Sequence, residues 1–329
     1  MFIDEMKVNM IKQRFGGCMF KRTRAYYGVK KHPSYPFEKD QLKRLLAEHT
    51  KVWLKEFFCV FGSQGLKRER NISLMKIYNC FCDIYTPPQD ASLLDFNGIV
   101  VAKPDREIDK VILAWEVTDF FLYYLIDDIA FCDMVCGEGP YEFAEVRVSA
   151  SGTHDHVIID CGANMGLFSA MSSRKGAKVY AFEPDKYTIE NHLSKTAQLN
   201  PNINICEYAL LDKEGKICFT QDTNHIGMNK ISSAETAKSN DTIVQAITLD
   251  AFVEKHDIPR VDFIKADIEG AERYMLMGAK QVLKEYAPKI SICTYHRPDD
   301  AKVLRGIILD ANPHYIVEGK FSKMYAYVK

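Results

Sequence analysis

The segment from Val157 to Gly166 constrains the fold of this chain more than any other part of the sequence. It begins with an apolar run of strand length that ends at Asp160, and a turn with glycines at Gly162 and Gly166 follows before a helical pattern. In open α/β sheets, units of this kind bring the carboxyl end of a strand and the amino end of a helix to the ligand crevice. Glycine lets the backbone approach a ligand closely, and a helix N-terminus favours a carboxylate. We therefore expect a ligand-binding strand–turn–helix unit here.

The rest of the C-terminal half alternates between short β-rich runs and helical segments. The expected strands are 157–160, 178–182, 203–210, 261–266 and 289–294, and the expected helices are 166–174, 186–199, 249–256 and 271–286. Two hairpins are expected as well, pairing 216–220 with 243–247 and 315–318 with 324–328. Alternation of strand and helix indicates right-handed crossovers, so the predicted fold class is α/β, with a mostly parallel sheet and helices on both faces.

The first part of the chain has a different character. Between about residues 37 and 127, apolar and aromatic side chains recur at intervals of three and four, and one such segment stops at Pro87-Pro88, which cannot continue a helix. The pattern changes near Gly137. We therefore expect a mainly helical region at 1–137, which caps the site, binds substrate or forms a homodimer, and a catalytic domain at 138–329.

Charge and composition argue against several partners. The chain has 43 basic and 44 acidic side chains, so no excess positive charge attracts nucleic acid. The richest apolar stretch, 111–131, contains four carboxylates, so we expect no membrane insertion. No signal-peptide pattern is visible, and the ten cysteines contain no Cys-x-x-Cys pair. These features favour a cytoplasmic protein with reduced thiols.

The turn after the first strand indicates the kind of ligand. A dinucleotide enzyme would show Gly-x-Gly-x-x-Gly, whereas this turn has Gly162-x-x-x-Gly166 preceded by the acid Asp160. A carboxylate beside the turn suits an ammonium group better than a pyrophosphate, and S-adenosylmethionine carries an amine, a carboxylate and a sulfonium. Glu183 ends the next expected strand, where a carboxylate can accept both hydroxyls of a ribose. Together the two motifs predict a nucleoside-type ligand.

At this point the sequence resembles the FkbM-type methyltransferases, a branch of the class I S-adenosylmethionine-dependent enzymes. The matching blocks lie within 138–329 and are Asp160–Gly166, Ala181–Pro184, Thr248–Phe252, Asp262–Glu272, and Tyr295-His296 with Asp300. The resemblance implies a Rossmann-like fold with a seven-stranded sheet and a cofactor site made of Asp160, Gly162, Ala163, Asn164, Gly166, Glu183 and Pro184. In this assignment the turn holds the methionine end of S-adenosylmethionine, and Glu183 holds the ribose. The resemblance also implies O-methylation of a small-molecule or glycan acceptor, commonly at a sugar hydroxyl.

The candidate catalytic residues are Asp267, Glu269 and His296. Asp267 and His296 follow two expected strands that should be neighbours in the sheet, and Glu269 lies in the turn after Asp267. Histidine has an intrinsic pKa suited to a general base near neutral pH. One histidine with carboxylates does not specify a metal site, so we assign no metal ligands, and a divalent metal remains the less favoured alternative.

Three other functions stay open at this stage. They are a nicotinamide-dependent oxidoreductase, a cofactor-binding protein without catalysis, and methyl transfer to nitrogen, which would need no base. The polar segment 221–241 is long for a structureless loop in a compact domain, which makes it a candidate lid.

Overall fold

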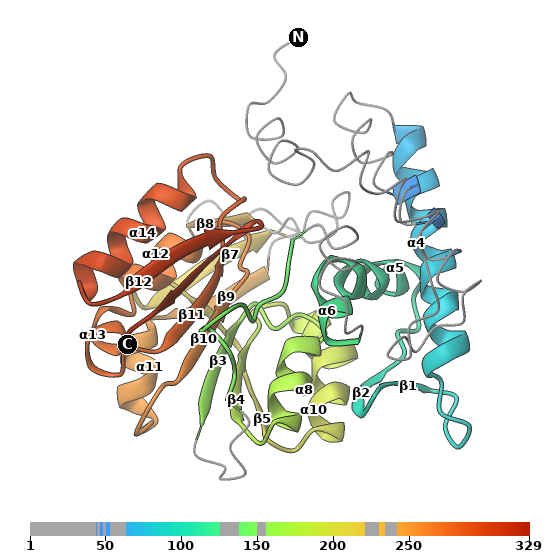
Figure 1. Ribbon diagram of the computed structural model, residues 1–329, viewed down its shortest axis with the longest axis horizontal. Helices are drawn as coiled ribbons and strands as arrows, with labels where there is room; N and C mark the ends of the chain where they lie inside the picture. The colour runs from blue at the N-terminus through green and yellow to red at the C-terminus, as the bar shows by residue number, and fades with distance from the viewer. Residues whose placement is uncertain are drawn as a thin grey trace. The chain divides into compact units, whose positions relative to one another are not determined.

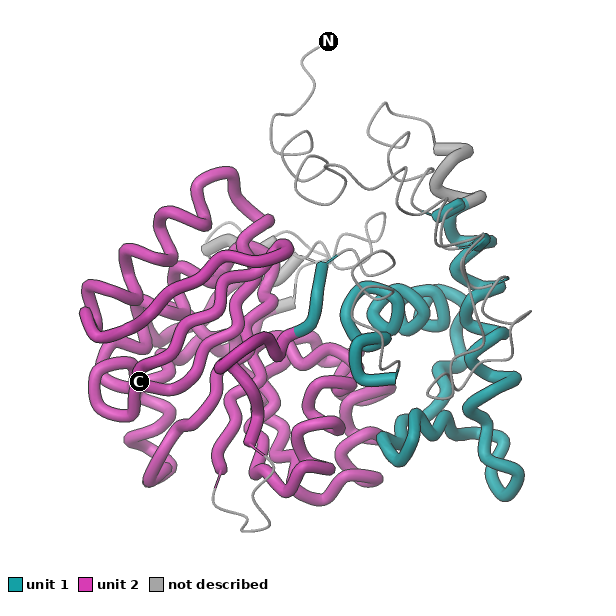
Figure 2. The backbone as a smooth tube through the Cα atoms, viewed as in Figure 1, with its two compact units in different colours: residues 1–140 teal, residues 141–329 magenta. Residues whose placement is uncertain are grey.

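The computed structural model describes residues 44, 47–48, 51–52, 64–125, 138–149, 156–220, 230–233 and 242–329. The chain divides into two compact units, residues 1–140 and 141–329, which Figure 2 draws in different colours. No helix in the described ranges is long and apolar enough to cross a bilayer. The cysteines within these ranges are free thiols: Cys80, Cys82, Cys161, Cys206, Cys218 and Cys293.

The N-terminal unit is mainly helical within its described part. Its elements are the helix α4 (Gln64–Tyr85), the strands β1 (Leu93–Phe96) and β2 (Ile99–Ala102), and the helical run α5 (Glu107–Glu116), η1 (Val117–Phe121) and α6 (Leu122–Leu125). Helix α4 ends just before Pro87-Pro88, as predicted. The β1–β2 hairpin was not predicted, although its two-residue turn, Asn97-Gly98, has positive φ at both positions and is a strong hairpin signal.

Aromatic side chains hold this unit together. Phe96 from the hairpin packs against Tyr85 of α4 and Phe121 of η1, with ring centroids 4.8 and 5.5 Å apart. Phe96 and Phe121 are fully buried. Tilted and edge-on ring pairs at such distances are favourable contacts beyond the burial of apolar area. The aromatic residues of this region therefore form a core in the structure.

The C-terminal unit is built on a seven-stranded sheet (Figure 1). In spatial order its strands are β12 (Ile316–Lys320), β13 (Lys323–Tyr327), β11 (Lys289–Cys293), β10 (Phe263–Ala266), β3 (Val157–Cys161), β4 (Lys178–Phe182) and β5 (Ile203–Cys206). The five strands from β11 to β5 are parallel, and β13 runs antiparallel to both of its neighbours. This order, with one reversed strand, confirms the predicted mostly parallel sheet and the closing hairpin.

Helices cover both faces of this sheet, as Figure 1 shows. On one side lie α8 (Leu167–Arg174) and α10 (Ser194–Leu199), and on the other lie α11 (Leu249–Lys255), α12 (Glu272–Met277), α13 (Lys280–Glu285) and α14 (Asp300–Ala311). The short α9 (Lys186–Thr188) and η2 (Ile189–Leu193) lead into α10. Helix α14 was not predicted, and the predicted helix 271–286 is divided into α12 and α13.

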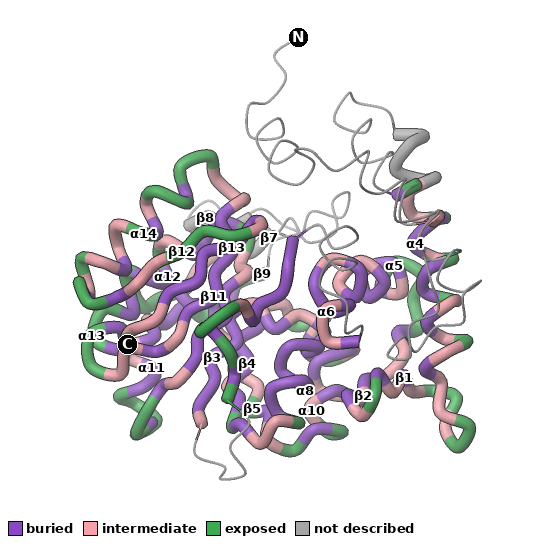
Figure 3. The backbone as a smooth tube through the Cα atoms, in the orientation of Figure 1, coloured by how far each residue is buried: buried purple, intermediate pink, exposed green. Residues whose placement is uncertain are grey.

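The innermost strands are buried along their whole length, which Figure 3 shows as continuous purple. Every residue of β3 and β10 is buried. A strand covered on both faces needs an unbroken apolar run, and both strands have one apart from Asp160 and Lys265. These two residues face each other in the β3–β10 register. The polar residue of β3 and that of β10 are thus direct partners.

A second, smaller sheet follows β5. It contains β6 (Tyr208–Leu210), β9 (Thr242–Ile247), β7 (Gly215–Thr220) and β8 (Lys230–Ser233), in that spatial order. The expected single strand 203–210 is therefore two strands that belong to different sheets. The predicted pairing of 216–220 with 243–247 is confirmed. Strand β8 lies within the candidate lid, and 221–229 and 234–241 are outside the described residues.

Candidate active site

The turn between β3 and α8 adopts the backbone that the glycine spacing predicts. Gly162 and Gly166 have φ of +77° and +88°, in the left-handed region that favours glycine. A Cβ at Gly162 would lie 2.0 Å from the carbonyl oxygen of Asp267, so the turn after β3 packs directly on the backbone that follows β10. The carboxyl ends of these two strands therefore form one continuous surface.

Asp160 lies inside the protein, with 0% exposure, and its carboxylate is bound by the chain itself. Its Oδ1 is 3.1 Å from Nζ of Lys265, and the hydroxyl of Ser169 donates to Oδ2 at 2.6 Å. Lys265 also donates to the carbonyl oxygen of Gly162 at 2.6 Å. Burial opposes the charge of Lys265, but Asp160 and Asp267 outweigh it and hold the lysine pKa above its usual range. The ion pair fixes the turn, and the Asp160 carboxylate faces Lys265 and Ser169.

Glu183 lies at the end of β4 and meets the same turn. Its carboxylate accepts hydrogen bonds from the backbone N–H groups of Asn164 and Asp185 at 3.0 and 2.9 Å. Burial raises the pKa of Glu183 to about 7, although these two hydrogen bonds act in the opposite direction. The ends of β3 and β4 are thus brought together as the sequence predicts. Pro184, between Glu183 and Asp185, belongs to the same connection.

The candidate catalytic residues also come together, at the ends of β10 and β11. Nε2 of His296 lies 3.6 Å from Oδ1 of Asp267 and 3.5 Å from Oε2 of Glu269. Nδ1 of the same ring lies 2.8 Å from Oε1 of Glu272, the first residue of α12. Glu272 is fully buried, and its Oε1 accepts the backbone N–H of Ile268 at 2.9 Å. One imidazole is therefore surrounded by three carboxylates.

This arrangement changes the charge state of both central groups. Burial lowers the pKa of His296, but Glu272, Glu269 and Asp267 outweigh burial and raise it to about 10. Burial raises the pKa of Asp267, but the charges of His296 and Lys265 outweigh it and lower the pKa to about 2. The intrinsic histidine pKa assumed from the sequence thus does not apply here, because three carboxylates stabilise the imidazolium.

Two tyrosines complete the surroundings of Asp267, and sequence reasoning missed both as site residues. The hydroxyl of Tyr141 donates to Oδ2 of Asp267 at 2.6 Å, and that of Tyr295 donates to Oδ1 at 3.4 Å. The ammonium of Lys323 lies 4.5 Å from the centre of the Tyr141 ring. Tyr141 is 126 residues before Asp267, so no local pattern could have revealed this contact.

Asp300 holds the segment that follows His296. Its carboxylate accepts the backbone N–H of Arg297 at 2.7 Å and a hydrogen bond from the Arg273 guanidinium at 2.6 Å. Burial is the main cause that raises the pKa of Asp300, with the Arg273 hydrogen bond opposing it. Asp300 therefore fixes the backbone beside His296 and links it to α12.

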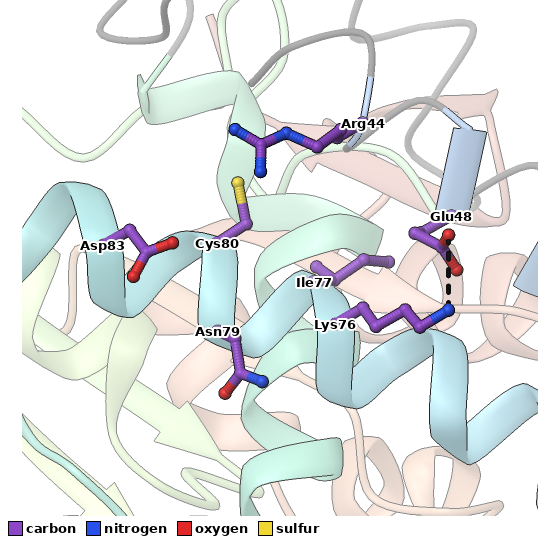
Figure 4. A pocket seen from close by; sticks show the side chains of 7 residues that line it. All are labelled: Arg44, Glu48, Lys76, Ile77, Asn79, Cys80 and Asp83. Carbon is purple, nitrogen blue, oxygen red and sulfur yellow. Dashed lines mark ion pairs between the residues drawn. The ribbon is translucent and has the colours of Figure 1, made fainter. Parts of the chain in front are cut away.

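The N-terminal unit has a pocket of its own, of about 290 Å³ (Figure 4). It is lined by Arg44, Glu48, Lys76, Ile77, Asn79, Cys80 and Asp83. Figure 4 marks an ion pair between Lys76 and Glu48, whose charged atoms are 3.8 Å apart. The Lys76 side chain is 57% exposed, and an exposed pair at this distance is weak. This pocket has none of the predicted site residues.

A family model matches the C-terminal unit. The methyltransferase FkbM domain family matches residues 160–326. The hexuronic acid methyltransferase AglP of Haloferax volcanii is 28% identical over 130 residues, which are 40% of this chain and 52% of AglP. The match thus spans about half the length of this relative.

Two similar solved structures have low sequence identity to this chain. The methyltransferase FkbM of Methylobacillus flagellatus KT is 17% identical, with a TM-score of 0.43 over 89% of this chain and 72% of that chain. The fibrillarin pre-rRNA processing protein of Methanococcus jannaschii is 15% identical, with a TM-score of 0.32 over 54% of this chain and 67% of that chain. The family match covers just over half of the 329 residues and includes the site from Asp160 to His296, so the chain belongs to the FkbM family of S-adenosylmethionine-dependent methyltransferases.

Proposed function

We propose that this chain transfers a methyl group from S-adenosylmethionine to a hydroxyl of a sugar, a glycan or a glycosylated metabolite. The observation that carries the proposal is the direct packing of the Gly162 turn on the backbone of Asp267. This contact supports a cofactor site at the turn, next to the cluster of Asp267, Glu269 and His296. The similarity to a hexuronic acid methyltransferase supports a sugar acceptor.

The residues at the end of β3 and β4 fit the cofactor. The backbone of Gly162, Ala163, Asn164 and Gly166 would hold the methionine end, because this turn leads into the N-terminus of α8. Glu183, followed by Pro184, would accept the ribose hydroxyls, since each of its oxygens accepts one backbone N–H and retains a further lone pair. Asp160 would act through the turn, which it holds by way of Lys265.

When bound, S-adenosylmethionine would supply an electrophilic methyl carbon, to which the acceptor oxygen would form a C–O bond as the C–S bond breaks and S-adenosylhomocysteine is released. Alignment of the two reactants can supply up to about 7–11 kcal/mol of the acceleration in favourable cases. We assign the proton of the acceptor hydroxyl to the cluster of Asp267, Glu269 and His296. Asp267 and Glu269 can accept a hydrogen bond from the hydroxyl, and His296 lies between them.

The domain assignment remains part of the proposal. We assign methyl transfer to residues 138–329 and acceptor binding or dimerisation to the region 1–137. A homodimer would give twice the chain mass of 37.6 kDa in light scattering after size exclusion. If the protein stays a single species of 37.6 kDa at every protein concentration measured, acceptor binding remains the proposed role of the region 1–137.

The direct test of the proposed reaction follows isotope-labelled methyl from S-adenosylmethionine into a panel of acceptors. The panel contains hexuronic acids, neutral hexoses, their glycosides and amino sugars, and NMR of the product locates the methyl group. We expect an O-methyl signal on a hydroxyl of one sugar class. An N-methyl product would contradict hydroxyl transfer. Failure of every acceptor, with intact cofactor binding, would favour the alternative of a binding protein without catalysis.

A further inference from the structure

We propose that Asp267, Glu272 and His296 form a site for one divalent cation of the Mg²⁺ and Mn²⁺ class. Each of the three residues offers a ligand atom, and these atoms all lie within 4.8 Å of one another. In an octahedral Mg²⁺ site with bonds of about 2.1 Å, neighbouring ligand atoms are roughly 3 Å apart and opposite ones roughly 4 Å. The three side chains can therefore surround a cation after small side-chain adjustments, and His296 gives up its extra proton to solvent as the cation binds.

A second, independent observation concerns buried polar atoms that no hydrogen bond satisfies. Glu272 is 0% exposed, and its Oε2 makes no hydrogen bond in the described part of the protein. The His296 side chain is 8% exposed, and neither of its ring nitrogens makes a hydrogen bond there. Nδ1 lies 2.8 Å from Oε1 of Glu272, and this contact is an ion pair. Unsatisfied buried atoms of this kind are rare in folded proteins, and a bound ion is one of their explanations.

Other contacts leave the right atoms of the cluster available. Tyr141 binds Oδ2 of Asp267 at 2.6 Å, whereas Oδ1, the oxygen nearest to His296, accepts a longer hydrogen bond of 3.4 Å from Tyr295, which a cation can displace. In Glu272, Oε1 is held by the backbone N–H of Ile268, which fixes the carboxylate and leaves Oε2 for a ligand. The surrounding protein thus holds two of the three ligands in place before a cation binds.

The charges of the cluster favour a cation. Asp267, Glu269 and Glu272 bring three carboxylates around one imidazole. Two ammonium groups oppose this attraction: Lys265, which is paired with Asp160, and Lys323, which lies 4.5 Å from the centre of the Tyr141 ring. Carboxylate oxygens and water are the ligands that suit Mg²⁺ and Mn²⁺, and here the carboxylates outnumber the single imidazole. Glu269, whose side chain is 35% exposed, can hold a metal-bound water on the open side.

The catalytic role that we assign to this cation rests on the proposed function. A divalent cation beside the acceptor would bind the hydroxyl oxygen, lower the pKa of that hydroxyl and stabilise the developing alkoxide. The proton would then pass to a cluster carboxylate or to water. The site itself can be tested without any acceptor.

The test is a Mn²⁺ titration of the full-length, chelator-treated protein, followed by electron paramagnetic resonance. The variants are Glu272→Gln and His296→Gln, and Glu254→Gln, an exposed carboxylate on α11, is the matched control. Each variant is first shown to be folded by circular dichroism and thermal unfolding. We expect one saturable Mn²⁺, a ¹⁴N modulation in the spin echo that His296→Gln abolishes, and affinity at least tenfold lower in Glu272→Gln. Glu254→Gln should match the original protein.

No saturable Mn²⁺ binding, or binding that both site variants leave unchanged, would overturn the cation site. If Glu272→Gln does not fold, the spin-echo result of His296→Gln decides alone. The proposed function has a separate readout in the same samples. If the protein binds S-adenosylhomocysteine but does not bind Mn²⁺, only the cation site is contradicted. If it binds Mn²⁺ but does not bind S-adenosylhomocysteine, only the proposed function is contradicted.

Discussion

Several charged side chains of this protein are buried, and two of them, Lys265 and Asp160, form an ion pair at the centre of the sheet. Both side chains are buried and face each other across β10 and β3. Replacing Lys265 by Met leaves the Asp160 carboxylate without its partner. We expect a loss of about 3–5 kcal/mol in the free energy of unfolding, measured in urea. Adding Asp160→Asn should recover part of it, and a loss below about 1 kcal/mol would contradict the role of this pair.

Glu183 gives the cofactor site a pH dependence. Its pKa is raised to about 7, mainly by burial, and the proposed ribose contact needs the ionised carboxylate. From pH 8 to pH 6 the ionised fraction falls about tenfold, so the affinity for S-adenosylhomocysteine should fall about tenfold in calorimetry. Glu183→Gln should bind weakly at both pH values, and the exposed Glu190→Gln should behave as the original protein. Equal affinity of the original protein at pH 6 and pH 8 would argue against the ribose contact.

The same residue affects the stability of the protein without cofactor. The pKa of Glu183 is about 7 in the folded state, above its ordinary value of 4.5. Between pH 4.5 and about pH 7 the folded protein therefore binds more protons than the unfolded protein. The contribution of Glu183 to stability is therefore greatest below pH 4.5 and is lost as the pH rises through about 7. The cofactor site thus contains a group whose functional form is costly to bury.

Asp267 and His296 should affect the reaction and leave cofactor binding intact. Asp267→Asn and His296→Gln remove groups that we assign to the acceptor hydroxyl. We expect kcat to fall by about 10²–10⁴, with the dissociation constant of S-adenosylhomocysteine changed by less than about threefold. His314→Gln, on an exposed loop, is the control. Activity within about twofold of the original for both site variants would show that the acceptor proton leaves by another route.

At the scale of elements, the turn after β3 is the connection on which both halves of the site depend. Gly162→Ala would place a Cβ 2.0 Å from the carbonyl oxygen of Asp267, at a residue with φ of +77°. We expect a loss of roughly 2–5 kcal/mol in unfolding free energy, together with weaker S-adenosylhomocysteine binding. Gly319→Ala in β12, where a Cβ meets no atom within 4 Å, should cost roughly 0.5 kcal/mol or less. Equal stability of the two variants would contradict the close packing.

Elements with strong local patterns could be predicted from the sequence. The apolar runs of β3 and β10 identified buried strands, and Pro87-Pro88 marked the end of α4. The 203–210 segment was assigned one strand because nothing in its composition reveals that β5 and β6 join different sheets. Helix α14 is not predicted from the sequence, although the apolar residues of this helix have helical spacing. Strand pairing over long separations depends on tertiary packing, which a local pattern does not contain.

The candidate site was partly predictable for the same reason. Asp267 and His296 follow neighbouring strands, so the order of the sheet is enough to bring them together. The contact of Tyr141 with Asp267 joins segments that no pattern connects, and the burial of Asp160 depends on its partner Lys265. The charge state of His296 follows from three carboxylates that only the fold assembles.

At the scale of the whole molecule, the central claim is that this chain uses S-adenosylmethionine. The family match, the seven-stranded sheet and the turn that joins β3 to α8 all belong to one unit, residues 141–329. A cofactor site contained in one unit should bind its ligand whether or not an acceptor is present.

The most direct measurement is a calorimetric titration of the full chain with S-adenosylhomocysteine, with NADH as the control ligand. We predict saturable binding at one site, which Glu183→Gln weakens at least tenfold, and no binding of NADH. A clean NADH isotherm without any binding of S-adenosylhomocysteine would contradict the claim and indicate a nicotinamide-dependent oxidoreductase instead.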